Sequence, residues 1–143
     1  MPFIKENLVK FFIKLILVSI PLVALWFWVG KEAYVKLYTF LVDLIVPFFG
    51  TKSSVFPIPT AFFNNLVPFT VLTLITGSWF SKLKVKYLVF GWFILISGHF
   101  LTAEFLYLMD VWKFSDELYS WLLTPLSILS GTLPFILWIV LLE

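Results

Sequence analysis

The segment Tyr87–Leu108, YLVFGWFILISGHFLTAEFLYL, constrains the fold more than any other part of the chain. It is long enough to cross the hydrocarbon core of a bilayer, which takes about 20 predominantly apolar residues in a helix. The segment also holds the only histidine of the chain, His99, and a carboxylate, Glu104. Because ionisable side chains are costly in lipid, each needs a partner or a functional reason to be there. We therefore expect a transmembrane helix that other segments cover.

The rest of the chain has the composition of a membrane protein. It is 62% hydrophobic and 13% charged, whereas soluble domains average about 25% charged residues. Further apolar runs of spanning length cover about Phe11–Val29, Ala61–Trp79 and Leu118–Leu142. With Tyr87–Leu108, these runs predict an all-α integral membrane bundle of four transmembrane helices, formed by residues 1–143 as a single membrane domain.

The segment between the first two runs, KEAYVKLYTFLVDLIVPFFG, is too polar for a comfortable span. Its apolar residues recur at helical spacing. They are Leu37, Phe40, Leu41, Leu44 and Ile45. This pattern predicts an amphipathic helix over about 33–49 that lies at the membrane interface, ended by Pro47 and Gly50. In the first run we expect a kink at Pro21, because proline removes a backbone donor.

The positions of the lysines orient the predicted bundle. Cytoplasmic loops of membrane proteins carry an excess of Lys and Arg. The compact loop SKLKVK, between the second and third runs, concentrates lysines, and the N-terminal segment holds Lys5, Lys10 and Lys14. We therefore expect a multi-pass protein of the inner (cytoplasmic) membrane with both termini on the cytoplasmic side.

The residue types that are missing exclude several kinds of site. The chain has no cysteine and no arginine. It therefore has no thiol nucleophile, disulfide or thiolate metal site, and no guanidinium to clamp a phosphate or carboxylate. One histidine cannot supply both ligands of a bis-histidine haem or the clustered imidazoles of a typical zinc site. With a net charge of only +2, the chain also lacks the footprint of a nucleic-acid-binding protein. We expect no catalytic residue, metal or cofactor.

Four polar side chains lie inside the predicted spans or at their start: His99, Glu104, Asn64 and Asn65. For His99, the first interpretation is an imidazole hydrogen-bonded to a neighbouring helix, and the alternatives are a proton relay or a contact with haem or quinone. Glu104 is interpreted as a protonated or hydrogen-bonded carboxylate, and the two asparagines as helix caps. Alternatively, Asn64, Asn65 and Glu104 form one polar cluster near the outer face. His99 and Glu104 are about 140° apart in a helical projection, so we do not expect them in one site.

Small residues form stripes at helical spacing on the last two runs. They are Gly91, Gly98 and Thr102 on the third run, and Ser120, Thr124, Ser127 and Gly131 on the fourth. Small residues let helices approach closely, which matters in lipid because no hydrophobic driving force brings helices together there. We interpret both stripes as helix-packing seams. A polar lining for a substrate is the alternative for the fourth run.

The order of these segments resembles that of the short exosortase/archaeosortase family of membrane transpeptidases. A basic N-terminal span leads to an amphipathic segment, a loop and three further spans, and PTAFFNNLVPFTVLTLITGSW stands where that family begins its catalytic span. The family's chemistry uses a cysteine, an arginine and a histidine. Here Asn64 or Asn65 stands near the expected cysteine, and LTAEF and LYSW stand near the other two, so no catalytic residue carries over. The resemblance therefore implies a catalytically inactive relative.

These observations predict a non-enzymatic accessory or structural subunit of a larger membrane protein complex, with other membrane subunits and lipids as its partners. Polar groups on two faces of Tyr87–Leu108, together with the small-residue stripes, favour helix partners over catalysis. Two other functions stay open. One is a substrate-handling protein, either an inactive exosortase-like peptide binder or a small carrier with a proton relay. The other is a quinone- or haem-proximal anchor of a respiratory complex.

Overall fold

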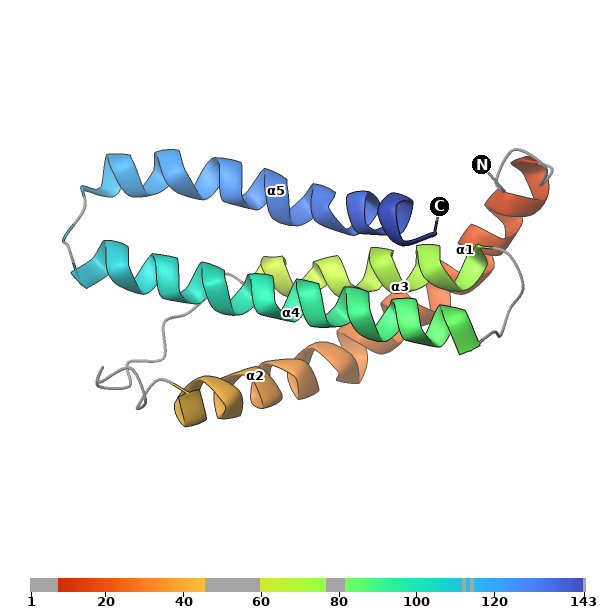
Figure 1. Cartoon of the computed structure of the whole chain (residues 1–143), viewed down its shortest axis with the longest axis horizontal. Coiled ribbons are helices and arrows are strands. Elements are labelled where there is room, and N and C mark those ends of the chain that lie inside the picture. Colours follow the sequence, from red (N-terminus) through yellow and green to blue (C-terminus); the bar gives the residue numbers. More distant parts are fainter. Residues whose placement is uncertain (1–7, 46–59, 77–81, 112, 114, 143) are drawn as a thin grey trace.

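The computed structural model describes residues 8–45, 60–76, 82–111, 113 and 115–142. All secondary structure in these residues is helical (Figure 1). The elements are α1 (Leu8–Leu25), η2 (Trp26–Gly30), α2 (Lys31–Ile45), η4 (Thr60–Asn65), α3 (Leu66–Ile75), α4 (Lys82–Val111) and α5 (Asp116–Leu142). The prediction of an all-α fold is confirmed for the part of the chain that the structure describes.

Three helices are long and apolar enough to cross a membrane, which indicates a membrane protein: Leu8–Leu44, Lys82–Met109 and Asp116–Leu141. A shorter apolar helix covers Phe62–Ile75. The sequence predicted four spans and a separate interfacial helix. The structure differs because α1 and α2 join into one helical segment and because the second predicted span is short where it is described. Residues 77–79 of that span and 46–49 of the predicted interfacial helix lie outside the described residues.

The junction between α1 and α2 is a turn of π-helix, η2, instead of a break. The backbone N–H of Lys31 donates to the carbonyl of Trp26, which is the i→i+5 bond that defines this helix type. Such turns are a common cause of helix kinks. In Figure 1, α1 runs obliquely to the long helices, while α2 turns to follow them more closely. Pro21 lies inside α1, one turn before η2.

The core of the bundle is α3, the shortest of the α-helices. Most of its residues are buried, and it packs against α1, α4 and α5 (Figure 1). The sequence had pointed to Tyr87–Leu108 as the covered helix. In the structure, however, α4 exposes large apolar side chains such as Val89, Phe93 and Leu101. Lipid is a suitable surrounding for these side chains, so an apolar helix need not be central.

Local hydrogen bonds satisfy the polar groups of α3. The hydroxyls of Thr70, Thr73 and Thr76 each donate to the carbonyl four residues earlier. The buried Lys84 ammonium of α4 donates to the Leu74 carbonyl at 3.0 Å, a position where the helix dipole favours a cation. The indole N–H of Trp138 from α5 donates to Thr76 Oγ1 at 2.9 Å. The C-terminal end of α3 is therefore fastened to both α4 and α5.

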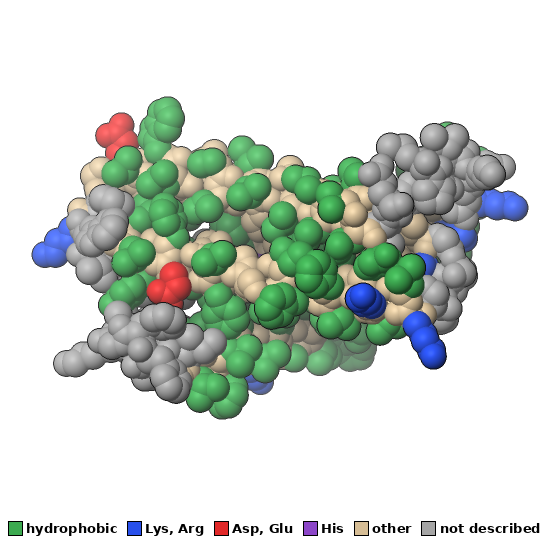
Figure 2. All heavy atoms as spheres, viewed as in Figure 1, with side chains coloured by type: hydrophobic (Ala, Val, Ile, Leu, Met, Phe, Trp, Pro, Cys, Tyr) green, Lys and Arg blue, Asp and Glu red, His purple; other side chains and the backbone are tan. Residues whose placement is uncertain are grey.

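On the face shown in Figure 2, hydrophobic side chains run along the length of the bundle, and most of the charged side chains lie towards its two ends. Phe11 and Leu15 of α1 pack against a buried cluster on α3 that includes Ile75. Lys10 and Lys14 consequently lie at the same end of the bundle as Lys82, at the start of α4. We call this the lysine end, defined by Lys10, Lys14, Lys82 and Lys86.

The start of α5 follows the pattern expected from its sequence. Ser115 precedes the helix, and its hydroxyl oxygen accepts a hydrogen bond from the Leu118 backbone N–H at 3.4 Å. Asp116 and Glu117 occupy the first turn, where the helix dipole favours negative charge. The Ser115 side chain therefore caps α5, as serine commonly does at a helix N-terminus.

Candidate functional site

His99 lies near the middle of α4 and is only 2% exposed. Its Nδ1 lies 2.6 Å from the Tyr34 hydroxyl of α2, and its Nε2 lies 3.0 Å from Asn65 Oδ1. An amide oxygen can only accept a hydrogen bond, so the arrangement assigns the proton of a neutral ring to Nε2, and Nδ1 accepts from Tyr34. The hydrogen bond to a neighbouring helix that the sequence predicted for His99 is therefore present, and a second bond accompanies it.

Asn65 extends these contacts to α5. It is the last residue of η4, is 7% exposed, and donates through Nδ2 to Ser130 Oγ at 3.1 Å. Tyr34, His99, Asn65 and Ser130 thus form one chain of side-chain hydrogen bonds, which we call the His99 network. It joins α2, α4, η4 and α5. Since an unpaired buried polar group costs about 1–3 kcal/mol, a fully paired chain holds the four elements in one arrangement.

The other sequence candidates have separate surroundings. Asn64 accepts a hydrogen bond from the Trp26 indole N–H at 3.0 Å, which joins η4 to η2. Glu104 has an exposed side chain on α4. Within the described residues it shares no hydrogen bond with either asparagine, so the structure does not bring the three into one polar cluster. Asn64 and Asn65 separate because adjacent residues of the η4 turn point towards different neighbours.

Aromatic rings enclose the His99 network on the α2 side. Phe63 lies 5.1 Å from the His99 ring and 5.0 Å from the Tyr34 ring, measured between centroids. Tyr38 is 4% exposed and packs on Phe100, with their centroids 5.1 Å apart. Its hydroxyl is the one buried side-chain polar atom without a hydrogen-bond partner in the described part of the chain.

Tyr34, Tyr38 and Ser130 did not stand out in the sequence. The apolar pattern of the α2 region instead singled out Leu37, Phe40 and Leu44, which are 52%, 63% and 55% exposed. The available signal was the spacing of the two tyrosines, four residues apart and therefore on one face of a helix. The two tyrosines therefore mark the face of α2 that packs against the rest of the bundle.

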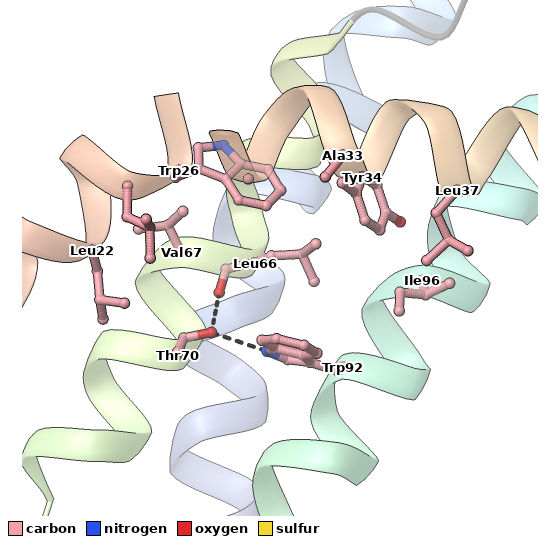
Figure 3. Close-up of a pocket in the computed structure, with 12 residues that line it drawn as sticks. Leu22, Trp26, Ala33, Tyr34, Leu37, Leu66, Val67, Thr70, Trp92 and Ile96 are labelled. Carbon is pink, nitrogen blue, oxygen red and sulfur yellow. Dashed lines mark hydrogen bonds between the residues drawn. The ribbon is translucent and has the colours of Figure 1, made fainter. Parts of the chain in front are cut away.

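An apolar cavity of about 440 Å³ lies beside the network, between the α1–α2 bend and the helices α3 and α4 (Figure 3). Tyr34 contributes to both the cavity wall and the network. The Trp92 indole N–H donates to Thr70 Oγ1 at 2.9 Å, and the same hydroxyl donates to the Leu66 carbonyl at 2.7 Å (Figure 3). The polar atoms on this wall are therefore engaged within the protein.

The predicted packing seams have two kinds of surroundings. Gly91 is buried where α4 meets α3, and a Cβ placed there would lie 2.0 Å from Phe69 Cζ. At Gly98 and Gly131, a Cβ would meet nothing within 4 Å. The side chains of Ser120, Thr124 and Ser127 are exposed on α5. Thr102, also on α4, donates to the Gly98 carbonyl of its own helix at 2.8 Å.

Comparisons with protein families, curated proteins and solved structures give no match to this chain. Within the described ranges, no three His, Asp or Glu side chains gather in a way that could hold a metal ion. In the His99 network the partner of the His99 Nε2 atom is the Asn65 amide, and an amide does not take up and release protons as a carboxylate does. The geometry of the His99 network is better suited to holding helices together through hydrogen bonds than to relaying protons.

Proposed function

We propose that this chain is a non-enzymatic accessory subunit of a larger membrane protein complex, bound to its partner through the outward surfaces of α2 and α5. The observation that carries the proposal is an ion pair on α2 that faces away from the bundle. Lys36 Nζ lies 2.8 Å from Glu32 Oε1, and the two side chains are 75% and 73% exposed.

The depth of this ion pair argues for a partner. Tyr34 lies between the two charged residues in sequence and contacts His99. Along α4, His99 is about 18 Å from Val111 and about 26 Å from Lys82, at 1.5 Å per residue. Since the hydrocarbon core is about 30 Å thick, a bilayer that embeds α4 surrounds the pair with lipid. A charged side chain at that depth costs about 2.5–3.5 kcal/mol. The polar surface of a second subunit would remove much of that cost.

The exposed face of α5 supports the same proposal. Ser120, Thr124, Ser127 and Gly131 recur there at helical spacing. The hydroxyl of Thr124 donates to the Ser120 carbonyl of the same helix at 3.1 Å. This hydroxyl therefore does not require a hydrogen-bond acceptor from a partner subunit. A smooth face of small side chains with open space above Gly131 lets a partner helix approach closely.

For the topology, we propose that α3 is a fourth membrane segment, surrounded by the three helices of spanning length. We assign α2 to the bundle instead of the membrane surface, because Tyr34 and Tyr38 pack it against α4. The lysine end would face the cytoplasm of a cell with this chain in its inner membrane, in line with the excess of lysines in cytoplasmic loops. Both chain termini would then lie on that side.

The proposal is tested by copurification of the full chain in mild detergent, followed by mass determination of the complex. We expect the chain to elute with at least one other membrane protein, and the double variant Glu32→Gln, Lys36→Gln to elute mostly as the free chain. The control is Lys82→Gln, Lys86→Gln, which neutralises two exposed charges four residues apart at the start of α4, outside the proposed interface. A stable monomer without a partner, or equal loss in both variants, would contradict the proposal.

A second candidate function, a substrate-handling membrane protein, is favoured by the cavity beside Tyr34. A peptide, as an inactive exosortase-like protein would bind, needs free hydrogen-bonding groups, whereas the polar atoms of this wall are engaged. The cavity therefore favours an apolar ligand. For a carrier with a proton relay, Glu104→Gln should change transport, and a change in assembly alone would support the accessory function. An absorption spectrum of the purified complex tests the haem-proximal alternative.

A further inference from the structure

We propose that the cavity between α1, α2, α3 and α4 binds one acyl chain of a membrane phospholipid, independently of any partner subunit. Its volume of about 440 Å³ lies within the range of about 300–1,000 Å³ typical of small-molecule sites. The wall includes Leu25, Leu37 and Trp92, which are 56%, 52% and 41% exposed. The cavity therefore opens at the surface of the bundle, where lipid chains would have access to it.

The chemistry of the wall selects hydrocarbon. Trp26, Tyr34, Thr70 and Trp92 supply all the polar side-chain atoms among the lining residues. The indole of Trp26 donates to Asn64, the Tyr34 hydroxyl contacts His99, and Trp92 donates to Thr70. A ligand with a polar ring would lose hydrogen bonds to solvent without gaining any here. An acyl chain makes no hydrogen bonds to solvent that it could lose, and it gains apolar contacts with the cavity wall.

Small residues at the bend keep the cavity open. Gly30 and Ala33 form part of the wall, just where η2 passes into α2. A Cβ at Gly30 would already lie 2.9 Å from Trp26 Cε3. A helix measures about 10–12 Å across with its side chains and about 5.4 Å per turn, so the volume of about 440 Å³ corresponds to roughly one helical turn and does not take up a second helix. A single extended hydrocarbon chain fits better.

The charge of the bundle complements the remainder of the phospholipid. Along α4, the wall residues Trp92 and Ile96 lie about 15 Å and 21 Å from Lys82, at 1.5 Å per residue. A headgroup at the lysine end can therefore stay at the membrane surface while its chain reaches the cavity. Lysines near a membrane surface attract the phosphate of anionic lipids. Lys82 and Lys86 are both exposed at that end.

The test is native mass spectrometry of the full chain purified in mild detergent, with identification of retained lipids by extraction. We expect one phospholipid per chain in the wild type. Ala33→Phe should abolish retention, because the ring fills the cavity. Ala24→Phe is the matched control: the same change at an exposed residue of α1 that does not line the cavity should leave retention unchanged.

A second measurement reports occupancy of the wall directly. Phospholipid brominated on its acyl chains is titrated into the delipidated protein in detergent, and the quenching of tryptophan fluorescence is followed. We expect saturable quenching near one lipid per chain, lost in Ala33→Phe and kept in Ala24→Phe. Leu37→Trp, one turn further along α2 on the same cavity wall, places a large ring in the cavity and should also abolish phospholipid retention. Circular dichroism identifies any variant that fails to fold.

Three results would overturn the proposal. The first is a wild type that retains no phospholipid and shows no saturable quenching. The second is that the folded Ala33→Phe and Leu37→Trp variants retain as much lipid as Ala24→Phe. The third is that the extracted molecule is a quinone or polyprenol. The copurification experiment tests the accessory function separately from lipid binding, because Glu32 and Lys36, which are substituted there, do not line the cavity.

Discussion

Two apolar helices, α3 and α5, have opposite places in this molecule. α3 is short, packs against α1, α4 and α5, and buries six of its ten residues. α5 is long, but the buried residues in its described part are Pro134 and Leu137, near its C-terminal end. Both carry hydroxyl side chains that bond to their own backbone. Both helices are thus apolar and pair their hydroxyls internally, and what distinguishes them is whether neighbours in the same chain cover them.

The largest expected effect on stability comes from the contact between α3 and α4. Gly91→Ala would drive a methyl group against the Phe69 ring, which is 1% exposed and has no room to move. We expect a loss of about 3 kcal/mol, at the upper end of the usual cost of overpacking. Thermal unfolding in detergent, followed by circular dichroism, measures it.

Gly131→Ala on α5 is the control for Gly91→Ala. A Cβ there meets nothing within 4 Å, and alanine favours a helix over glycine by up to about 1 kcal/mol. The two substitutions should therefore change stability in opposite directions. If they destabilise the chain equally, α3 is not packed as described.

The His99 network should give the next largest effect. His99→Phe keeps a ring at the site but leaves Asn65 Oδ1 and the Tyr34 hydroxyl without their partner. We expect a loss of about 2 kcal/mol, since each unpaired buried group costs about 1–3 kcal/mol. Glu104→Gln, at an exposed position of the same helix, should stay within about 0.5 kcal/mol of the wild type. Equal losses would show that His99 packs without depending on its hydrogen bonds.

A smaller effect is expected where α5 meets the end of α3. Thr76→Val removes the acceptor for the Trp138 indole N–H and should cost about 1 kcal/mol, the typical net value of one hydrogen bond. Thr132→Val is the matched substitution on the exposed side of α5, where the hydroxyl donates only to carbonyls of its own helix. Its unfolding temperature should stay close to that of the wild type, and a drop as large as that of Thr76→Val would contradict this comparison.

The smallest effect on stability, and the largest on assembly, is expected on the outward face of α5. Gly131→Leu has open space in this chain, so the unfolding free energy should change by less than about 0.5 kcal/mol. If a partner helix lies on this face, the same substitution should separate the complex during copurification. Gly98→Leu on α4 serves as the control, because a Cβ there also meets nothing within 4 Å. A complex that survives Gly131→Leu would remove α5 from the proposed interface.

Features that depend on one segment could be predicted from the sequence. The helical class, the Ser115 cap and the need of His99 for a partner all follow from local composition and spacing. The side of α2 that packs against the bundle could not be predicted. Lipid and protein interior are equally apolar, so hydrophobicity does not distinguish side chains that face the protein interior from those that face lipid. Tyr34 packs against α4, while Phe40 faces outward. The partners of His99 and Asn65 also escaped prediction, since Tyr34 and Ser130 each lie 65 residues away from them in sequence.

The π-helical turn at Trp26–Gly30 sets the phase of everything that follows it in the same helical segment. Each residue of an α-helix rotates the next side chain by about 100°, and η2 holds one more residue per turn than an α-helix would accept. Deleting a single residue from WFWVG would therefore restore an α-helical turn and leave α2 close to its present orientation. Tyr34 and Tyr38 would keep their contacts with His99 and Phe100. A deletion inside an α-helical segment such as α2, in contrast, turns every residue beyond it by about 100°. The π-helical turn is thus a place where this helical segment can lose a residue without exchanging its inner face for its outer one.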